Sequence, residues 1–126
     1  MADLQRSFDA LINHRSLWRT ALVISLIAIV ILATLNPAYP MPSLPSDKLN
    51  HLLAFVELTL LCRLSWPARP SWQFILPLLA FGLAIELVQA NLPYRDFDLW
   101  DLATDGVGVA LGLLPWPGLS RVRTGV

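Results

Sequence analysis

The chain has 126 residues, of which 56% are hydrophobic and 14% charged, a length that suits one domain. An average soluble domain carries roughly a quarter charged residues, so this deficit favours lipid over water as the main solvent of the fold. The formal net charge is zero, which argues against a nucleic-acid partner. The single cysteine, Cys62, excludes an internal disulfide and a thiolate zinc cage.

The first apolar segment, residues 20–35, predicts a membrane-spanning helix. It carries no charge and approaches the roughly 20 residues that a bilayer requires. A cleavable signal peptide is the alternative, because a basic segment precedes the apolar core. Residues 1–19 form a cytoplasmic or interfacial segment, in which Leu4, Phe8, Leu11 and Ile12 share one helix face. That face predicts a short interfacial helix, although a solvated extension of the first span is also compatible with it.

Three further apolar segments follow, at residues 49–66, 72–90 and 99–114. A proline-rich loop separates the first of them from residues 20–35. The last segment is the least apolar, since Asp101 and Asp105 lie inside it, and only a buried face makes it credible as a span. The sequence therefore predicts an all-α integral membrane bundle of about four transmembrane helices over residues 20–116, with a cytoplasmic tail at 117–126.

The basic residues favour a topology with both termini in the cytoplasm, because Lys and Arg collect on the cytoplasmic side of membrane proteins. With the N-terminus inside, only Lys48 and Arg95 fall on the outer side. The inner segments then hold the remaining basic residues, namely Arg6, Arg15, Arg19, Arg63, Arg69, Arg121 and Arg123. The opposite orientation would place these seven outside.

Polar side chains from three segments come to the outer leaflet in this topology. They are Asp47, Lys48, His51, Glu86, Gln89, Arg95, Asp98, Asp101 and Asp105. An aspartate at the centre of a transmembrane helix costs roughly 2.5–3.5 kcal/mol on insertion scales, so such residues normally face the bundle interior or a water-filled cavity. We therefore expect these side chains to converge on one polar site.

The spacing along residues 98–112 places the acidic residues of the last helix on one stripe. Asp98, Asp101 and Asp105 continue into Gly108 and Gly112 at steps of three and four residues. The two glycines form a small-xxx-small element that predicts close packing against another helix. Glu57 lies deeper and is turned away from His51, and its partner is left open.

Three ordered motifs resemble the VanZ-like family of small bacterial membrane proteins: SDKLNHLLAF at 46–55, ELVQANLP at 86–93 and RDFDLWDLATDGVGVALG at 95–112. The family pattern carries Asn where this chain has Asp105. The resemblance implies a bacterial cytoplasmic (inner) membrane protein of the cell envelope with a link to teicoplanin tolerance. It does not imply a reaction.

Two interpretations of the polar residues remain open. In the first, these residues only hold helices together. Arg95 then forms an ion pair with Asp98 or Asp101, Lys48 forms one with Glu86, and His51 forms a hydrogen bond with Asp47. In the second, they form a site, since five acids face only two fixed cations. Such a site would suit an enzyme that acts on a lipid-linked phosphate, or a divalent-metal centre. It would also suit a protein that binds a ligand, namely a membrane lipid, a lipid-linked envelope precursor or a lipoglycopeptide. The last alternative is a proton-coupled transporter that oligomerises.

Overall fold

The computed structural model describes residues 1–36, 47–95 and 97–122, with only the backbone of Asp47 and Ser120. Over these residues the chain is all-helical and contains no strand. Its elements are α1 (Ala2–Ile12), α2 (Arg15–Thr34), α3 (Asp47–Ser65), the 3₁₀ turn η1 (Ser71–Phe74), α4 (Ile75–Ala90), α5 (Leu99–Gly112) and the 3₁₀ turn η2 (Leu119–Arg121). The expected proline-rich loop and Arg123 lie outside the described residues.

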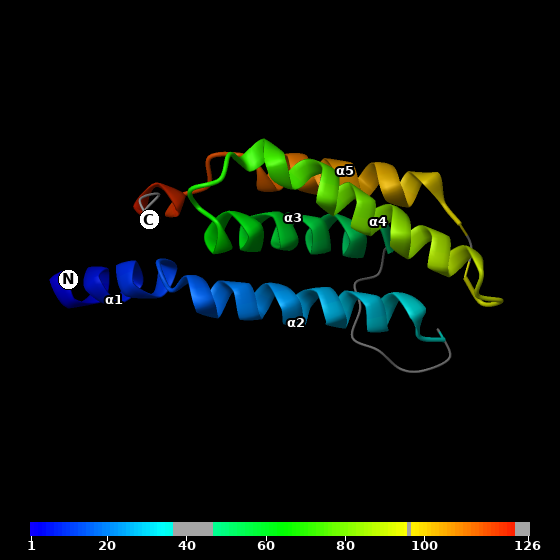
Figure 1. Cartoon of the computed structure of the whole chain (residues 1–126), viewed down its shortest axis with the longest axis horizontal. Coiled ribbons are helices and arrows are strands. Elements are labelled where there is room, and N and C mark those ends of the chain that lie inside the picture. The colour runs from blue at the N-terminus through cyan, green and yellow to red at the C-terminus, as the bar shows by residue number, and fades with distance from the viewer. Residues whose placement is uncertain (37–46, 96, 123–126) are drawn as a thin grey trace.

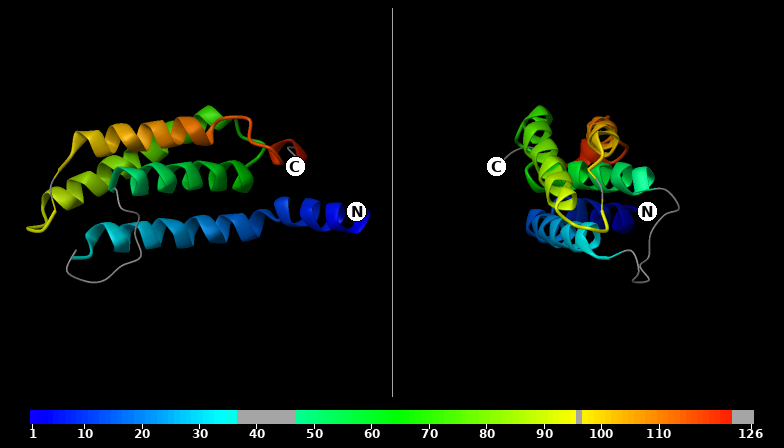
Figure 2. Two further views of the ribbon diagram at one scale, coloured as in Figure 1. Left: turned by 180° about the vertical axis from the view of Figure 1, so that it is seen from behind. Right: turned by 90° about the vertical axis from the view of Figure 1, so that its right-hand side faces the viewer.

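Helices α2, α3, α4 and α5 run alternately up and down along one direction, with α3 between α2 and α5 and with α4 crossing obliquely (Figures 1 and 2). The N-terminus and the last described residues consequently lie at the same end of the bundle (Figure 1). An ion pair joins these segments there, with Nη1 of Arg121 3.0 Å from Oδ1 of Asp9. The C-terminal ends of α2 and α4 lie at the opposite end (Figure 1).

Helix α1 continues roughly in line with α2 rather than turning across its end (Figures 1 and 2). The junction is closed by local hydrogen bonds: the indole N–H of Trp18 donates to the carbonyls of Leu11 and Ile12, and Nδ1 of His14 accepts from the N–H of Leu17. Caps of this kind satisfy the unpaired backbone groups at both helix ends. The arrangement fits the extension of the first span better than a helix lying flat on a membrane.

The four helices expected from hydropathy are present, but only two are long and apolar enough to cross a membrane. Within the described residues these are Arg15–Thr34 and Ser71–Ala90, each of 20 residues. Helix α5 has 14 residues, which at 1.5 Å per residue is roughly 21 Å, short of a hydrocarbon core of about 30 Å. Helix α3 has Lys48, His51, Glu57 and Arg63 along its length. The expectation of about four spanning helices is thus met only in part.

The bundle combines an apolar core with an outer surface that is also rich in apolar side chains. Its core joins all four long helices through Leu22, Phe55, Leu58, Leu61, Cys62, Phe74, Leu78 and Val109. Many large apolar side chains nevertheless remain outside, such as Ile24 at 62% and Leu76 at 77% exposure, whereas Glu86 and Asp105 are completely buried. Apolar surface on this scale requires a partner or a lipid environment.

The contact between α3 and α5 is the closest in the bundle because two glycines of α5 face α3. A Cβ atom at Gly108 would lie 2.7 Å from the carbonyl oxygen of Leu52, and one at Gly112 would lie 2.5 Å from Cβ of Thr59. Any side chain at these positions would push the helices apart. The close approach brings the acidic stripe of α5 against the face of α3 that carries His51.

Candidate functional site

The polar residues singled out from the sequence form two separate groups in the structure. Gln89 and Arg95 contact the end of α2, together with Tyr94. The remaining described residues lie between α3, α4 and α5 and are called the polar cluster below. The polar cluster consists of Lys48, His51, Glu86, Asp98, Asp101 and Asp105. The side chain of Asp47 lies outside the described part of the chain.

The first group satisfies the carbonyl groups at the C-terminal end of α2. Nε2 of Gln89 donates to the carbonyl of Ala33 over 3.0 Å, and the hydroxyl of Tyr94 donates to that of Thr34. Nη2 of Arg95 lies 3.2 Å from the carbonyl oxygen of Leu35. The last carbonyls of a helix lack partners within it and carry partial negative charge, so an arginine is well placed there. These bonds stabilise the end of α2, and among the described residues Arg95 contacts backbone carbonyls rather than a carboxylate.

His51 and Asp105 form the centre of the polar cluster. Nδ1 of His51 lies 2.8 Å from Oδ1 of Asp105, whose side chain is fully buried, and His51 itself is 18% exposed. The position of Asp105 depends on α4, because Gly82 leaves room for its second oxygen: a Cβ there would lie 2.6 Å from Oδ2. A buried carboxylate behind an imidazole holds the ring in one orientation and one tautomer.

Glu86 completes the buried part of the polar cluster from α4. Its Oε2 accepts a hydrogen bond of 3.1 Å from the backbone N–H of Asp98, at the start of α5. Its other oxygen, Oε1, is buried without a hydrogen-bond partner, as is Oδ2 of Asp105. Buried carboxylate oxygens are costly when nothing replaces their water, so these two atoms mark a place where a ligand or a proton is needed.

Lys48 links the cluster to the surface of the bundle end. Its Nζ donates to Oδ2 of Asp98 at 3.0 Å and to Oδ1 of Asp101 at 3.1 Å. The hydrogen bond that Lys48 donates to Asp98, and then the one that it donates to Asp101, raise the pKa of Lys48 above its ordinary value. The same hydrogen bond from Lys48, followed by one from the N–H of Trp100, lowers the pKa of Asp98. Both shifts favour the charged forms of Lys48 and Asp98.

The observed pairs differ from those expected if the polar residues only held one another in place. Lys48 contacts Asp98 and Asp101 instead of Glu86, and the described partner of His51 is Asp105. Arg95 contacts backbone carbonyls rather than an aspartate. These pairings follow from the depth of each side chain along the bundle, which hydropathy does not specify.

Sequence reasoning did not find two contributors to this end of the bundle. Gly82 lies one turn before Glu86, and a glycine within an otherwise strong apolar helix was its only signal. Tyr94 lies next to Arg95 and had no signal beyond that position. Glu57, whose partner was open, accepts a hydrogen bond from the hydroxyl of Ser25 on α2 and is remote from the polar cluster.

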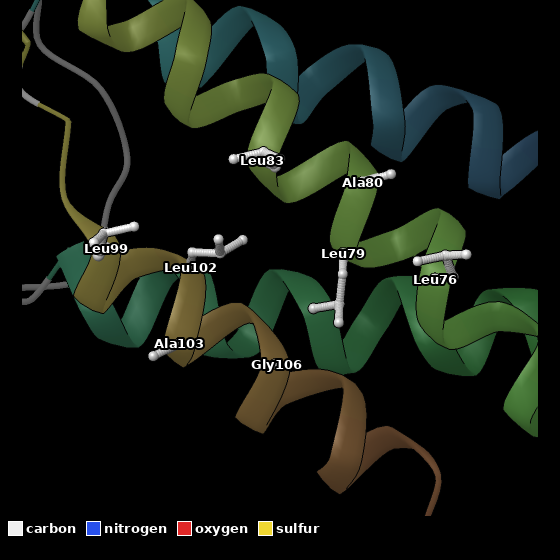
Figure 3. A pocket seen from close by; sticks show the side chains of 8 residues that line it. All are labelled: Leu76, Leu79, Ala80, Leu83, Leu99, Leu102, Ala103 and Gly106. Atoms are coloured by element: carbon white, nitrogen blue, oxygen red, sulfur yellow. The ribbon is translucent and has the colours of Figure 1, made fainter.

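An apolar groove lies on the outer side of the bundle between α4 and α5 (Figure 3). It has a volume of about 600 Å³ and is lined by Leu76, Leu79, Ala80, Leu83, Leu99, Leu102, Ala103 and Gly106. Leu79 and Leu102 extend into the space between the two helices (Figure 3). Leu99 and Leu102 each follow directly after a cluster aspartate in the sequence, Asp98 or Asp101, so the groove and the polar cluster share the first turns of α5.

The cluster as a whole is rich in acid. Glu86, Asp98, Asp101 and Asp105 face one ammonium, that of Lys48, and one imidazole. Such a site attracts cations, and its imidazole can accept or donate a proton with Asp105 behind it. A helical bundle with apolar sides and a buried histidine–carboxylate cluster at one end is the class of protein that the fold and site define.

Comparison with known proteins supports this class. The chain matches the VanZ/LLP1 family over residues 5–120 and belongs to that family, so the resemblance predicted from the three motifs is confirmed. It is also similar to an uncharacterised protein of Schizosaccharomyces pombe, with 35% identity over 107 residues. That match covers 80% of this chain and 65% of the length of the yeast protein. No solved structure matches the chain.

Proposed function

We propose that this chain is an integral membrane protein that binds a membrane lipid, with the lipid head group at the polar cluster and an acyl chain in the α4–α5 groove. The carrying observation is that the first turns of α5 contribute residues to both halves of a lipid site. Leu99 and Leu102 line the apolar groove, and Asp98 and Asp101, which directly precede them in the sequence, bind Lys48. Pockets for small molecules combine apolar walls with a few polar groups in this way.

The exposed apolar surface supports insertion of the whole bundle into a membrane. Helix α2 has large exposed residues along its length, including Val23, Ile27 and Ile31 at 54%, 55% and 51% exposure. If α2 and α4 cross a bilayer, α3 lies between α2 and α5 at the same depth (Figure 1). We infer a multi-pass protein with four membrane helices and both termini in the cytoplasm. The bacterial cytoplasmic (inner) membrane is the location that the family resemblance implies.

Several features favour a phospholipid as the ligand. Lys48 is 49% exposed and has three N–H donors, of which the aspartates use two, so one can reach a lipid phosphate. A relative in a fungus favours a lipid that fungal membranes also contain over a precursor particular to bacterial envelopes. Any role in teicoplanin tolerance would act through this lipid site.

Blocking the groove tests the proposal directly. We expect Ala103→Trp to fill the groove and remove most of the phospholipid that co-purifies with the protein in detergent, measured by mass spectrometry of extracted lipid. Val107→Trp is the matched control, since Val107 is also on α5 and 53% exposed but does not line the groove. Equal lipid content in both variants and the wild-type protein would refute lipid binding at this groove.

The phenotype of a deletion strain provides a second test. We expect His51→Ala and Glu86→Gln to be unable to restore the wild-type envelope phenotype in the deletion strain, including any altered glycopeptide tolerance. Both variant proteins should nevertheless accumulate normally. Residues that only hold helices together predict the reverse, with activity falling in proportion to the level of folded protein.

A second candidate function, an enzyme acting on the same lipid, is favoured by the 2.8 Å contact between His51 and the buried Asp105. In it, His51 would transfer the proton during cleavage or formation of a lipid phosphate bond. His51→Ala would then change the composition of the bound lipid, with unprocessed substrate accumulating on the protein. Lipid binding alone predicts the same bound lipids in smaller or unchanged amounts.

A further inference from the structure

Three residues of the polar cluster each have one polar atom in a hydrogen bond and a second polar atom that forms no hydrogen bond among the described residues. His51 directs Nδ1 to Asp105 at 2.8 Å, while its Nε2 lies 3.7 Å from Oδ2 of Asp101. Asp101 directs its other oxygen, Oδ1, to Lys48 at 3.1 Å. Glu86 directs Oε2 to the backbone N–H of Asp98, and its Oε1 is buried without a partner.

The second atoms belong to residues that are close enough to share one ion. One ligand atom from each of His51, Glu86 and Asp101 lies within 4.8 Å of those of the other two. Ligand atoms around a divalent metal lie roughly 3–4 Å apart when the bonds are about 2.0–2.2 Å long, so small side-chain movements would complete the shell. The three ligands come from α3, α4 and α5, so an ion there would join three helices.

The surroundings of His51 are those of a metal-binding histidine. A ligating imidazole almost always donates its other N–H to a carboxylate or carbonyl, which fixes the tautomer and orients the ring. With its proton on Nδ1, His51 donates to Asp105 and presents the Nε2 lone pair towards Asp101. Asp105 would then be a positioning residue, held in place by the space that Gly82 leaves.

Charge and burial add an independent argument, because Glu86 and Asp105 have no exposed side-chain surface and each has one oxygen without a hydrogen-bond partner. Buried ionised carboxylates are normally paired or coordinate metals. From this geometry we propose that His51, Glu86 and Asp101 bind a divalent cation of the Mn²⁺ or Zn²⁺ class, with Asp105 orienting His51. One imidazole with two carboxylates is a ligand set that suits these ions.

This site goes beyond the lipid-binding function and does not depend on it. If both are correct, the cation resolves the charge problem of the acid-rich cluster, because a bound divalent ion would attract the lipid phosphate that the carboxylates alone would repel. Metal binding can be measured on delipidated protein, so its failure and the failure of lipid binding are distinguishable.

The test is titration of the full-length protein in detergent with MnCl₂, followed by electron paramagnetic resonance, and with ZnCl₂, followed by calorimetry. We expect one ion to bind per chain. Mutation of residues behind the ligands of a metal site typically weakens binding 10–100-fold, so loss of a ligand in Asp101→Asn should weaken it at least that much. Asp101→Asn keeps the size of a side chain that is 14% exposed, and it should therefore fold.

Glu57→Gln is the matched control, since Glu57 is an exposed carboxylate on α3 that contacts Ser25 and not the polar cluster. We expect it to bind the ion with wild-type affinity. As a second measurement, the ion should raise the melting temperature of the wild-type protein and of Glu57→Gln but not that of Asp101→Asn.

Binding that is equal in all three proteins would indicate adventitious surface sites and overturn the proposal. Absence of binding to the wild-type protein would also overturn it and would leave shared protons as the means by which the carboxylates are buried.

Discussion

Gly82 makes room for the side chain of Asp105, a role that the apolar residues around it in the sequence do not suggest. It lies in a helix of apolar residues, yet the absence of a side chain there gives the carboxylate of Asp105 its place beside His51. The family resemblance described above implies an asparagine amide at position 105, which has nearly the same shape as the carboxylate. The space beside Gly82 therefore suits either side chain, and the carboxylate adds charge without adding volume.

We predict that Gly82→Ala damages the polar cluster. The new Cβ would lie 2.6 Å from Oδ2 of Asp105 and 3.2 Å from Cζ of Phe55, so Asp105 must move and weaken its contact with His51. Overpacking of this kind costs roughly 1–3 kcal/mol, measured as a lower melting temperature in detergent.

Gly106→Ala serves as the control for Gly82→Ala. Its Cβ would lie 3.8 Å from Leu79, an ordinary contact, and alanine is favoured over glycine in a helix by about 1 kcal/mol. We therefore expect unchanged or higher stability. If both variants melted alike, Gly82 would have no special role in placing Asp105.

At the scale of helices, the pairing of α3 with α5 determines where the acidic residues go. The stripe of aspartates and glycines predicted along residues 98–112 lies against α3 over its whole length, with Asp105 at His51, Gly108 at Leu52 and Gly112 at Thr59. The contact also ends with a cap, because Nη1 of Arg63 donates to the carbonyls of Gly112 and Leu114.

We predict that bulk at the glycines of α5 separates these helices. Gly108→Leu would place a large side chain 2.7 Å or less from the backbone of α3, so the yield of folded protein in detergent should fall strongly. Val107→Leu, at the exposed neighbouring position, should leave the yield unchanged. Normal yield and melting of Gly108→Leu would mean that α5 can leave α3 without loss.

Much of the fold at this scale could be predicted from the sequence, and the partners of the polar side chains could not. Hydropathy and helix periodicity located all four long helices to within a few residues, because apolar runs and helical stripes are local properties. The pairing of Lys48 with two aspartates and of Arg95 with backbone carbonyls depends on the relative height of three helices. The packing at Gly82, Gly108 and Gly112 contributes to that height, and the sequence pattern at Gly108 and Gly112 predicted close packing without identifying the partner helix or its register.

At the scale of the whole molecule, the N-terminus and the last described residues lie at one end of the bundle (Figure 2). Helices α3 and α5, whose first turns carry Lys48 and Asp101 of the polar cluster, begin towards the other end (Figure 1). We predict that both termini are cytoplasmic when the protein is in a membrane. A reporter that is active only outside the cytoplasm should be active when fused after Pro93 and inactive when fused after Val126. The reverse result would overturn the proposed orientation, and activity at both sites would overturn the number of spans.

Three arginines at the end of the bundle that holds the N-terminus also stabilise the fold, which limits how the orientation of this protein could change in evolution. Arg19 donates to the carbonyl of Ser65, Arg63 to those of Gly112 and Leu114, and Arg121 to the carboxylate of Asp9. Adding or moving basic residues can invert the topology of a membrane protein. Here each relocated arginine would also uncap a helix or break a contact between segments. In the proposed orientation the same residues therefore direct insertion and stabilise the bundle, and we expect relatives of this chain to diversify at the polar cluster rather than by inverting in the membrane.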